Sequence, residues 1–151
     1  MANIYTAFKT NVVTIIKANA GVTGLLANGE NSFFQILPDV TQALPCISYH
    51  IPTRAPIGQV APRKNWQVTL TIRIHGTDPD VVDDIDAAFD DMLEAAELTD
   101  GTLTDANVMV KDFLETEAVD SDLDPRALAR DKISEIRTRT FGCIIVKPPS
   151  S

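Results

Sequence analysis

Two short acidic runs hold the residues whose types and spacing could do chemistry. In the first run, the imidazole of His75 and the carboxylates of Asp78 and Asp80 lie close together in the sequence, and such groups can hold a metal ion. Asp78 and Pro79 also mark the start of an expected helix, where carboxylates satisfy free amide hydrogens and favour the helix dipole. Helix capping therefore explains this run better than metal binding.

The second run, Asp120–Asp131, matches part of a calcium-binding loop. Its carboxylates fall at positions one, three, five and twelve of that pattern, but position six is Pro125 where glycine is needed, and position twelve is Asp131 in place of glutamate. An acidic loop or a short helix is the better interpretation. The sequence also lacks a phosphate-binding glycine loop and a serine elbow. We therefore expect no catalytic residue, no metal and no cofactor.

Composition favours one globular domain. The chain has 151 residues, 44% of them hydrophobic, so it can bury a core without disulfides or metals. A net charge of −8 argues against a large nucleic-acid footprint. The apolar runs are far shorter than the roughly 20 residues that span a bilayer, so we expect no membrane contact. Cys46 and Cys143 lie in apolar, strand-like runs, which predicts buried thiols.

Hydrophobic periodicity predicts two main helices. The first covers Ile4–Ala18 with Asn3 as its cap, and the second begins after Asp78. Apolar residues at helical spacing form the buried stripe of the second helix, and they are Val82, Ile85, Phe89, Met92 and Ala96.

Alternating apolar residues predict the strands. The clearest case places Trp66, Val68, Leu70, Ile72 and Ile74 on one strand face, with polar residues between them. The expected strands are Leu44–Ile51, Asn65–His75, Thr102–Glu117 and Ile133–Val146. The predicted fold class is α+β, an antiparallel or mixed four-stranded sheet with two main helices packed on one face. We expect a single domain over residues 1–147 and a tail at 148–151.

The segment 52–64, PTRAPIGQVAPRK, is predicted to be a long and mobile loop between two strands. It has three prolines, three bases and no acid, although a two-residue turn could have joined the same strands. Long connections in small domains often carry function. We therefore expect Arg54, Arg63 and Lys64 to take part in binding.

Charge is distributed unevenly along the chain. The second helix carries a row of acids, which is most simply a solvent-exposed face but could also form one side of a charged contact. Basic residues elsewhere could supply the opposite charge, which permits head-to-tail association into a ring. Besides the three loop bases, the residues predicted at a subunit or partner interface are Arg73 and His75 on the open strand face, and Arg137 and Arg139 on the last strand.

The order of elements resembles the tail terminator or tail completion proteins of long-tailed bacteriophages of the siphophage type. The runs NVVTIIKANAGVTGLL, LPCISYHIP and NWQVTLTIRIHGTDPDVVDDI carry this resemblance, which covers roughly residues 4–97. It implies a small α+β protein that assembles in the host cytoplasm and resides in the virion, at the head-proximal end of the tail. There it would form a ring, typically a hexamer, between the tail tube protein and the head connector or neck protein.

The same resemblance implies that genomic DNA passes through the ring without sequence-specific binding. A lumen lined with carboxylates would let DNA slide, and the candidates on the second helix are Asp83, Asp86, Asp90 and Glu94. Two alternatives stay open. The chain could be a neck, head-completion or minor tail protein of the same particle, or it could be a soluble metal-binding module or enzyme that uses its acidic clusters.

Overall fold

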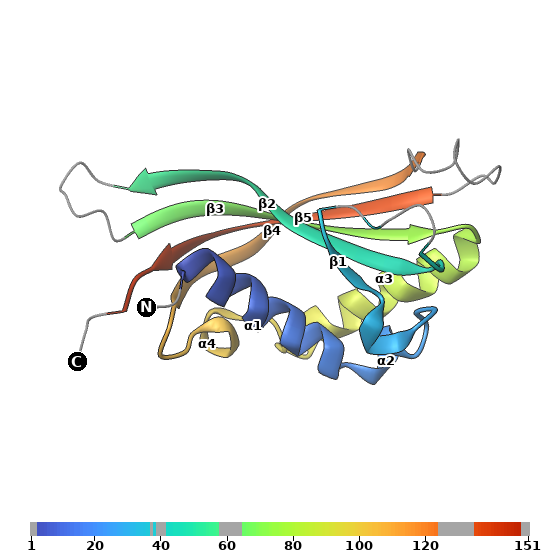
Figure 1. Ribbon diagram of the computed structural model, residues 1–151, viewed down its shortest axis with the longest axis horizontal. Helices are drawn as coiled ribbons and strands as arrows, with labels where there is room; N and C mark the ends of the chain where they lie inside the picture. The colour runs from blue at the N-terminus through green and yellow to red at the C-terminus, as the bar shows by residue number, and fades with distance from the viewer. Residues whose placement is uncertain (1–2, 37, 39–41, 58–64, 124–134, 149–151) are drawn as a thin grey trace.

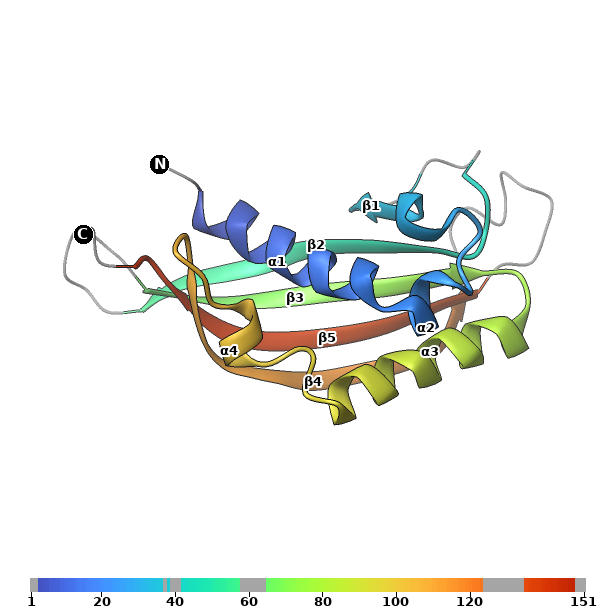
Figure 2. The same cartoon turned by 90° about the horizontal axis from the view of Figure 1, so that it is seen from below.

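The computed structural model describes residues 3–36, 38, 42–57, 65–123 and 135–148, and it shows a twisted sheet with its helices gathered on one face (Figures 1 and 2). The sheet has five strands in the order β1-β2-β3-β5-β4. All neighbouring strands are antiparallel except β1, which runs parallel to β2. The strands are β1 (Phe33–Gln35), β2 (Cys46–Ile57), β3 (Asn65–Gly76), β4 (Met109–Leu123) and β5 (Glu135–Val146).

The α+β class and the mixed sheet are as predicted, but the count of four strands was wrong because β1 was missed. β1 has three residues and pairs with Ile47–Tyr49 of β2. A strand this short gives no periodic signal in the sequence. The residue after it, Ile36, has a backbone φ of +68°.

The helices α1 (Ile4–Ala18) and α3 (Pro79–Glu94) begin where the sequence predicts. The Asn3 side chain accepts hydrogen bonds from the amides of Tyr5 and Thr6, and the Asp78 side chain accepts one from the amide of Asp80. The buried stripe of α3 is confirmed except at Ala96, which lies beyond the helix and is exposed. The short helices are α2 (Ala20–Thr23), a 3-10 turn η1 (Gly29–Asn31) and α4 (Asp100–Leu103). No helix in the described ranges is long and apolar enough to cross a membrane.

The strand β2 is longer than predicted, so the expected loop over 52–64 was wrong in its first part. β2 continues through Pro52 and Pro56 to Ile57, while residues 58–64 lie outside the described residues. Prolines are tolerated here because β1 pairs only with Ile47–Tyr49, which leaves the rest of β2 as an edge strand.

The strand β4 begins later than predicted and ends later too. The side chains of Thr99 and Thr102 form a capping box that starts α4, so residues near Thr102 are helical instead of extended. β4 then runs from Met109 to Leu123. The predicted acidic loop or short helix at Asp120–Asp131 is therefore strand in its first part, and the remainder lies outside the described residues.

The core lies between the sheet and the helices. The apolar face predicted for β3 is confirmed at Val68, Leu70, Ile72 and Ile74, which are buried with at most 1% of their surface exposed, while Trp66 is half-buried. The opposite face is less open than predicted, because Thr71 and His75 are buried too. The four buried apolar residues of β3 pack with apolar residues of α1, α3 and β5, among them Phe8, Ile85, Phe89, Phe141 and Ile145. This core fixes α1 and α3 on the same side of the sheet (Figure 2).

Candidate functional site

An ionic cluster joins α3 to the middle of the sheet. Its cations are Arg137 and Arg139 of β5, which pair in register with Ile74 and Ile72 of β3 and so lie on the helix-covered face. The guanidinium of Arg137 donates to the carboxylate of Asp83. The side chains of the two arginines are 11% and 4% exposed, so both charges are largely withdrawn from water.

Arg139 is held by carboxylates from two elements. Its Nε and Nη2 donate to the two carboxylate oxygens of Glu115 on β4, at 2.6 and 3.1 Å. Its Nη1 donates to Asp86 at 2.9 Å and its Nη2 to Asp90 at 2.6 Å, both on α3. Burial alone would lower the pKa of Arg139, but the hydrogen bonds to Glu115 and Asp90, with the charges of Glu115 and Asp86, raise it above its ordinary value. Arg139 is therefore a permanent cation that neutralises acids of α3 within the subunit.

The structure brings together residues that the sequence assigned to separate roles. Arg137 and Arg139 were expected at an interface, and Asp83, Asp86 and Asp90 were expected to line a lumen or a charged contact. They bind one another across the seam between β5 and α3. The fourth acid of that predicted set, Glu94, is exposed near the end of α3.

His75 is fully buried, although it was predicted on an open strand face. Its Nε2 lies 2.8 Å from the hydroxyl oxygen of Ser48 on β2. The helix-free face of the sheet is covered at this end, since Cys46, Ser48 and Ile136 are buried as well. His75 therefore offers no surface to a partner in the folded subunit. Within the described ranges, no group of three or more His, Cys, Asp or Glu side chains could hold a metal ion.

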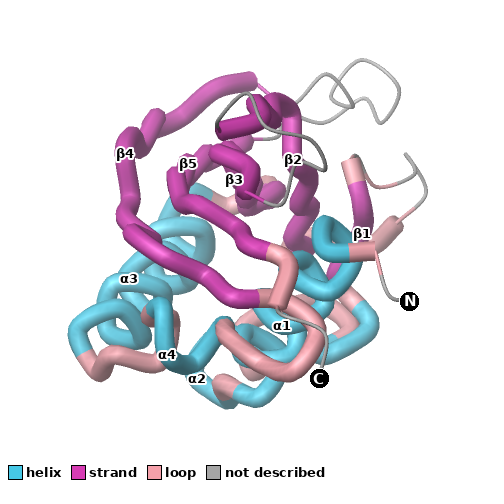
Figure 3. The backbone as a smooth tube through the Cα atoms, turned by 90° about the vertical axis from the view of Figure 1, so that its left-hand side faces the viewer, coloured by secondary structure: helices cyan, strands magenta, loops and turns pink. Residues whose placement is uncertain are grey.

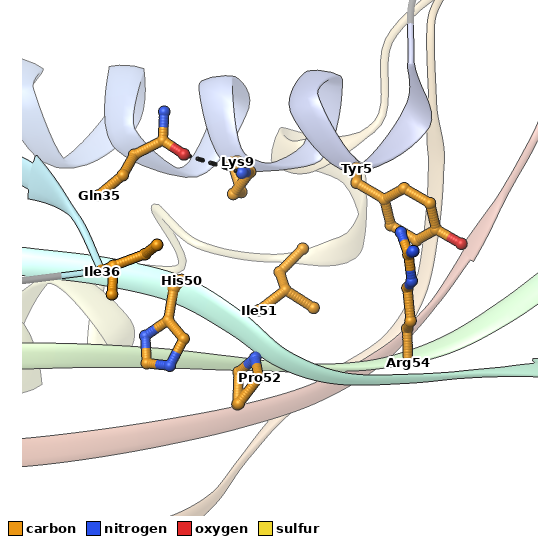
Figure 4. A pocket seen from close by; sticks show the side chains of 8 residues that line it. All are labelled: Tyr5, Lys9, Gln35, Ile36, His50, Ile51, Pro52 and Arg54. Carbon is orange, nitrogen blue, oxygen red and sulfur yellow. Dashed lines mark hydrogen bonds between the residues drawn. The ribbon is translucent and has the colours of Figure 1, made fainter.

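A cavity of about 370 Å³ opens between α1, β1 and β2 (Figure 4). The Lys9 ammonium on its wall donates to the side-chain oxygen of Gln35 at 2.9 Å, and the Arg54 guanidinium lies 4.5 Å from the ring centre of Tyr5. None of the described residues that line the cavity is acidic. The described part of the cavity lining therefore presents two cations and no counter-charge.

A histidine and a third cation extend this basic region. His50 lines the cavity, and its Nδ1 lies 3.2 Å from Nη1 of Arg73 on β3. Burial, followed by the charges of Arg73 and Lys9, lowers the pKa of His50 below its ordinary value. The neutral imidazole is thus favoured, and its Nδ1 can accept from Arg73. Among the described residues, Lys9, Arg54 and Arg73 form no ion pair, unlike Arg139.

The rim of the cavity carries an exposed and strained apolar residue. Ile36 is 63% exposed and has a φ of +68°, a conformation that β-branched residues rarely adopt. Its amide donates to the carbonyl oxygen of Tyr49 at 3.0 Å, which holds the strained backbone against β2. An exposed apolar side chain thus lies beside the two cations of the cavity.

The predicted interface bases therefore fall in three places. Arg54 lines the cavity and Arg73 lies beside it, whereas Arg137 and Arg139 are buried under α3. Arg63 and Lys64 lie outside the described residues. Of the described residues that line the cavity, Arg54 alone was predicted at a site. Lys9 looks like any lysine on the polar face of an amphipathic helix, and Gln35 and Ile36 belong to or follow a strand that the sequence does not predict.

Opposite edges of the molecule carry opposite charge. The end view in Figure 3 places β1 at one side and α3 with β4 at the other, in agreement with the strand order. The cavity with Lys9 and Arg54 lies at the β1–β2 edge. At the other edge, Asp84, Asp91 and Glu94 of α3 are exposed and form no ion pair with the described part of the chain.

The fold aligns with that of a chain from the virion of a native gene transfer agent (GTA) particle. The TM-score is 0.68 at 12% sequence identity, and the alignment covers 96% of this chain and 99% of that chain. The two chains therefore share a fold over nearly their whole lengths. No protein-family model and no curated protein matches the sequence.

Proposed function

We propose that this chain is a structural protein of a phage-like virion that completes the tail tube and forms a ring at the head-proximal end of the tail. The observation that carries the proposal is the agreement in fold with a virion chain over nearly the full length of both chains. Because sequence identity is 12%, this agreement concerns the fold. The specific place at the tail end rests on the resemblance to tail terminator proteins described above.

The distribution of charge supports assembly into a ring. A ring requires a heterologous interface, in which one edge of a subunit meets a different edge of the next. The basic β1–β2 edge and the acidic outer side of α3 form such a complementary pair. The proposed partners are further copies of the chain, in a hexamer, together with the tail tube protein and the head connector or neck protein.

The structure changes which residues suit these contacts. Arg54 and Arg73 remain candidates for a subunit or partner interface, as do Arg63 and Lys64. Arg137 and Arg139 act inside the subunit instead, because they hold α3 on the sheet. Genomic DNA would pass through the ring without specific contacts, and Glu94 is the member of the proposed lumen set that no arginine of the described chain neutralises.

The mass of the protein in solution tests this proposal. Sedimentation velocity across a range of concentrations, with and without a metal chelator, should give a species near six times the subunit mass of 16.4 kDa. The species should be indifferent to chelator and should show a central channel by electron microscopy. A monomer at every concentration would contradict a ring that forms in free solution, and would favour a neck or minor tail protein. A mass that changes with chelator would favour the alternative of a metal-binding module.

A further inference from the structure

The cavity at the β1–β2 edge has the composition of a receptor for carboxylates. It is lined by the Lys9 ammonium, the Arg54 guanidinium and His50, and no described lining residue is acidic. Arg73 lies next to the cavity, in contact with His50. Lys9 is satisfied by the neutral amide of Gln35, and Arg54 stacks on Tyr5. These contacts orient the two cations and leave their charges unneutralised. In a chain of net charge −8, such a concentration of positive charge attracts an anion.

The matching anions lie on the outer side of α3. Asp84, Asp91 and Glu94 follow the spacing i, i+7, i+10, so they form one stripe on the side opposite to the buried residues Val82 and Phe89. The intramolecular cluster uses the neighbouring row, which consists of Asp83, Asp86 and Asp90. One row of acids is thus neutralised within the subunit, while the outer stripe remains available.

The two surfaces cannot meet within one molecule, because β1 and β2 form one edge of the sheet while α3 lies beside β4 at the other edge (Figures 2 and 3). They can meet between two molecules placed side by side in the same direction. Each copy would then present its cavity to one neighbour and its α3 stripe to the other, a head-to-tail contact that gives a ring when the rotation between copies closes.

We propose that the cavity between α1, β1 and β2 receives the outer acidic stripe of α3 from a second copy of the chain. Lys9 and Arg54 bind the carboxylates of Asp91 and Glu94, and Ile36 at the rim supplies the adjacent apolar contact. This contact assigns Glu94 to the boundary between subunits in place of the lumen. The inference rests on the proposed ring, and it names the two surfaces that form the ring contact. A cavity of about 370 Å³ falls in the range of roughly 300–1,000 Å³ that accommodates small ligands, so it has room for side chains from a neighbour.

A complementary charge swap tests this contact. One variant carries Lys9→Glu and Arg54→Glu, and the other carries Asp91→Lys and Glu94→Lys. Each variant alone brings like charges together and should self-associate about tenfold or more weakly than the wild type at low salt. An equimolar mixture restores opposite charges at the contacts between unlike subunits, so its association should return toward that of the wild type.

The controls separate the contact from folding and from net charge. Lys111→Glu with Lys147→Glu makes the same change in net charge at two exposed lysines outside the cavity, and it should leave association nearly unchanged. Circular dichroism and the melting temperature report whether each variant folds. If the Lys9 substitution disturbs α1, Arg54→Glu alone carries the test, because Arg54 is exposed.

The outcomes distinguish this inference from the proposed function. If the wild type and the cavity variant form rings equally well, the inference is wrong, while the proposed ring is still supported. Two weakened variants whose mixture stays weakened also overturn it, since the cavity and α3 are then not partners. Loss of duplex-DNA binding in the cavity variant with unchanged self-association would assign the cavity to phosphate instead. A wild type that stays monomeric at every concentration removes both the ring in free solution and this contact.

Discussion

The guanidinium of Arg139 donates a 2.6 Å hydrogen bond to the carboxylate of Asp90, and so connects a central strand of the sheet to the helix above it. The helix α3 contains seven acidic residues and no basic one, including like charges at i, i+4 such as Asp86 and Asp90. Such pairs destabilise a helix on its own. Arg137 and Arg139 of β5 supply the positive charge that α3 lacks.

Removing this cation should destabilise the fold. Arg139→Met leaves Asp90 and Glu115 without a counter-ion and Asp86 with only its 3.7 Å contact to Arg137, and should lower the free energy of unfolding by about 2–4 kcal/mol. The expected loss is smaller than for a fully buried pair because the side chain of Asp90 is 59% exposed. Urea denaturation measures the change, and Lys111→Met at an exposed site is the control. A loss under about 0.5 kcal/mol would show that the cluster contributes little to stability.

Gly76 is expected to tolerate no larger side chain. A Cβ atom at this position would lie 2.5 Å from a methyl carbon of Val82, which is fully buried at the start of α3. Gly76→Ala should therefore lower the free energy of unfolding by about 1–3 kcal/mol. The matched control is Gly101→Ala, whose Cβ would meet nothing closer than 3.9 Å, and whose helical site should favour alanine. Equal melting temperatures for the two variants would contradict the close packing of β3 on α3.

The strain at Ile36 predicts a stabilising substitution. Asparagine tolerates positive φ better than isoleucine, and little buried surface is lost because Ile36 is 63% exposed. Ile36→Asn should raise the free energy of unfolding of the subunit by about 1 kcal/mol. Ile36→Val keeps the branched side chain and should give no such gain. Thermal unfolding of the two variants decides the point, and a less stable Asn variant would mean that the side chain is held by contacts that outweigh the strain.

Several of these features have a signal in the sequence, and others have none. Asn3, Asp78 and the apolar stripe of α3 follow local rules, so the helices begin where they were expected. Arg137 and Arg139 have the same parity along β5 as Phe141, a period of two that places them on the core face. The period of two along β5 thus indicates that both arginines are buried. The prediction placed them at an interface because charged side chains usually lie on the surface.

Other features depend on contacts between distant segments. The three residues of β1 are too few to show a period, and the cavity exists only because Lys9, Gln35 and Arg54 come from three different elements. The burial of His75 follows from packing on the helix-free side of the sheet, which the alternation along β3 alone does not show. Local patterns therefore predict elements, while the assembly of the elements decides which charges reach the surface.

The environment of His50 predicts that stability falls on acidification. Its pKa is lowered by burial and then by the charges of Arg73 and Lys9, so the unfolded chain binds a proton at a pH where the folded chain does not. Stability therefore decreases as the pH falls through the ordinary histidine pKa of about 6.5. His50→Gln should make the free energy of unfolding less dependent on pH between about 5 and 8. Identical pH slopes for the variant and the wild type would mean that folding leaves this pKa unchanged.

Both thiols should be unreactive in the folded protein. Cys46 is fully buried, and burial, with a smaller effect of the Asp100 charge, raises the pKa of Cys143 to about 12. A thiol that is both protonated and covered reacts slowly with disulfide reagents. Titration of the native protein near neutral pH should detect almost no free thiol, and titration in denaturant should detect two per chain. Rapid reaction of one thiol in the native protein would reveal local opening around that strand.

The position of β5 sets the order in which the molecule can be completed. β5 is the last strand in the sequence, yet it lies between β3 and β4 inside the sheet. Without β5, β4 has no neighbour in the sheet, and α3 lacks Arg137 and Arg139, which pair with its acids. The sheet is therefore complete, and its acidic helix fully neutralised from β5, only when this last strand takes its place between β3 and β4.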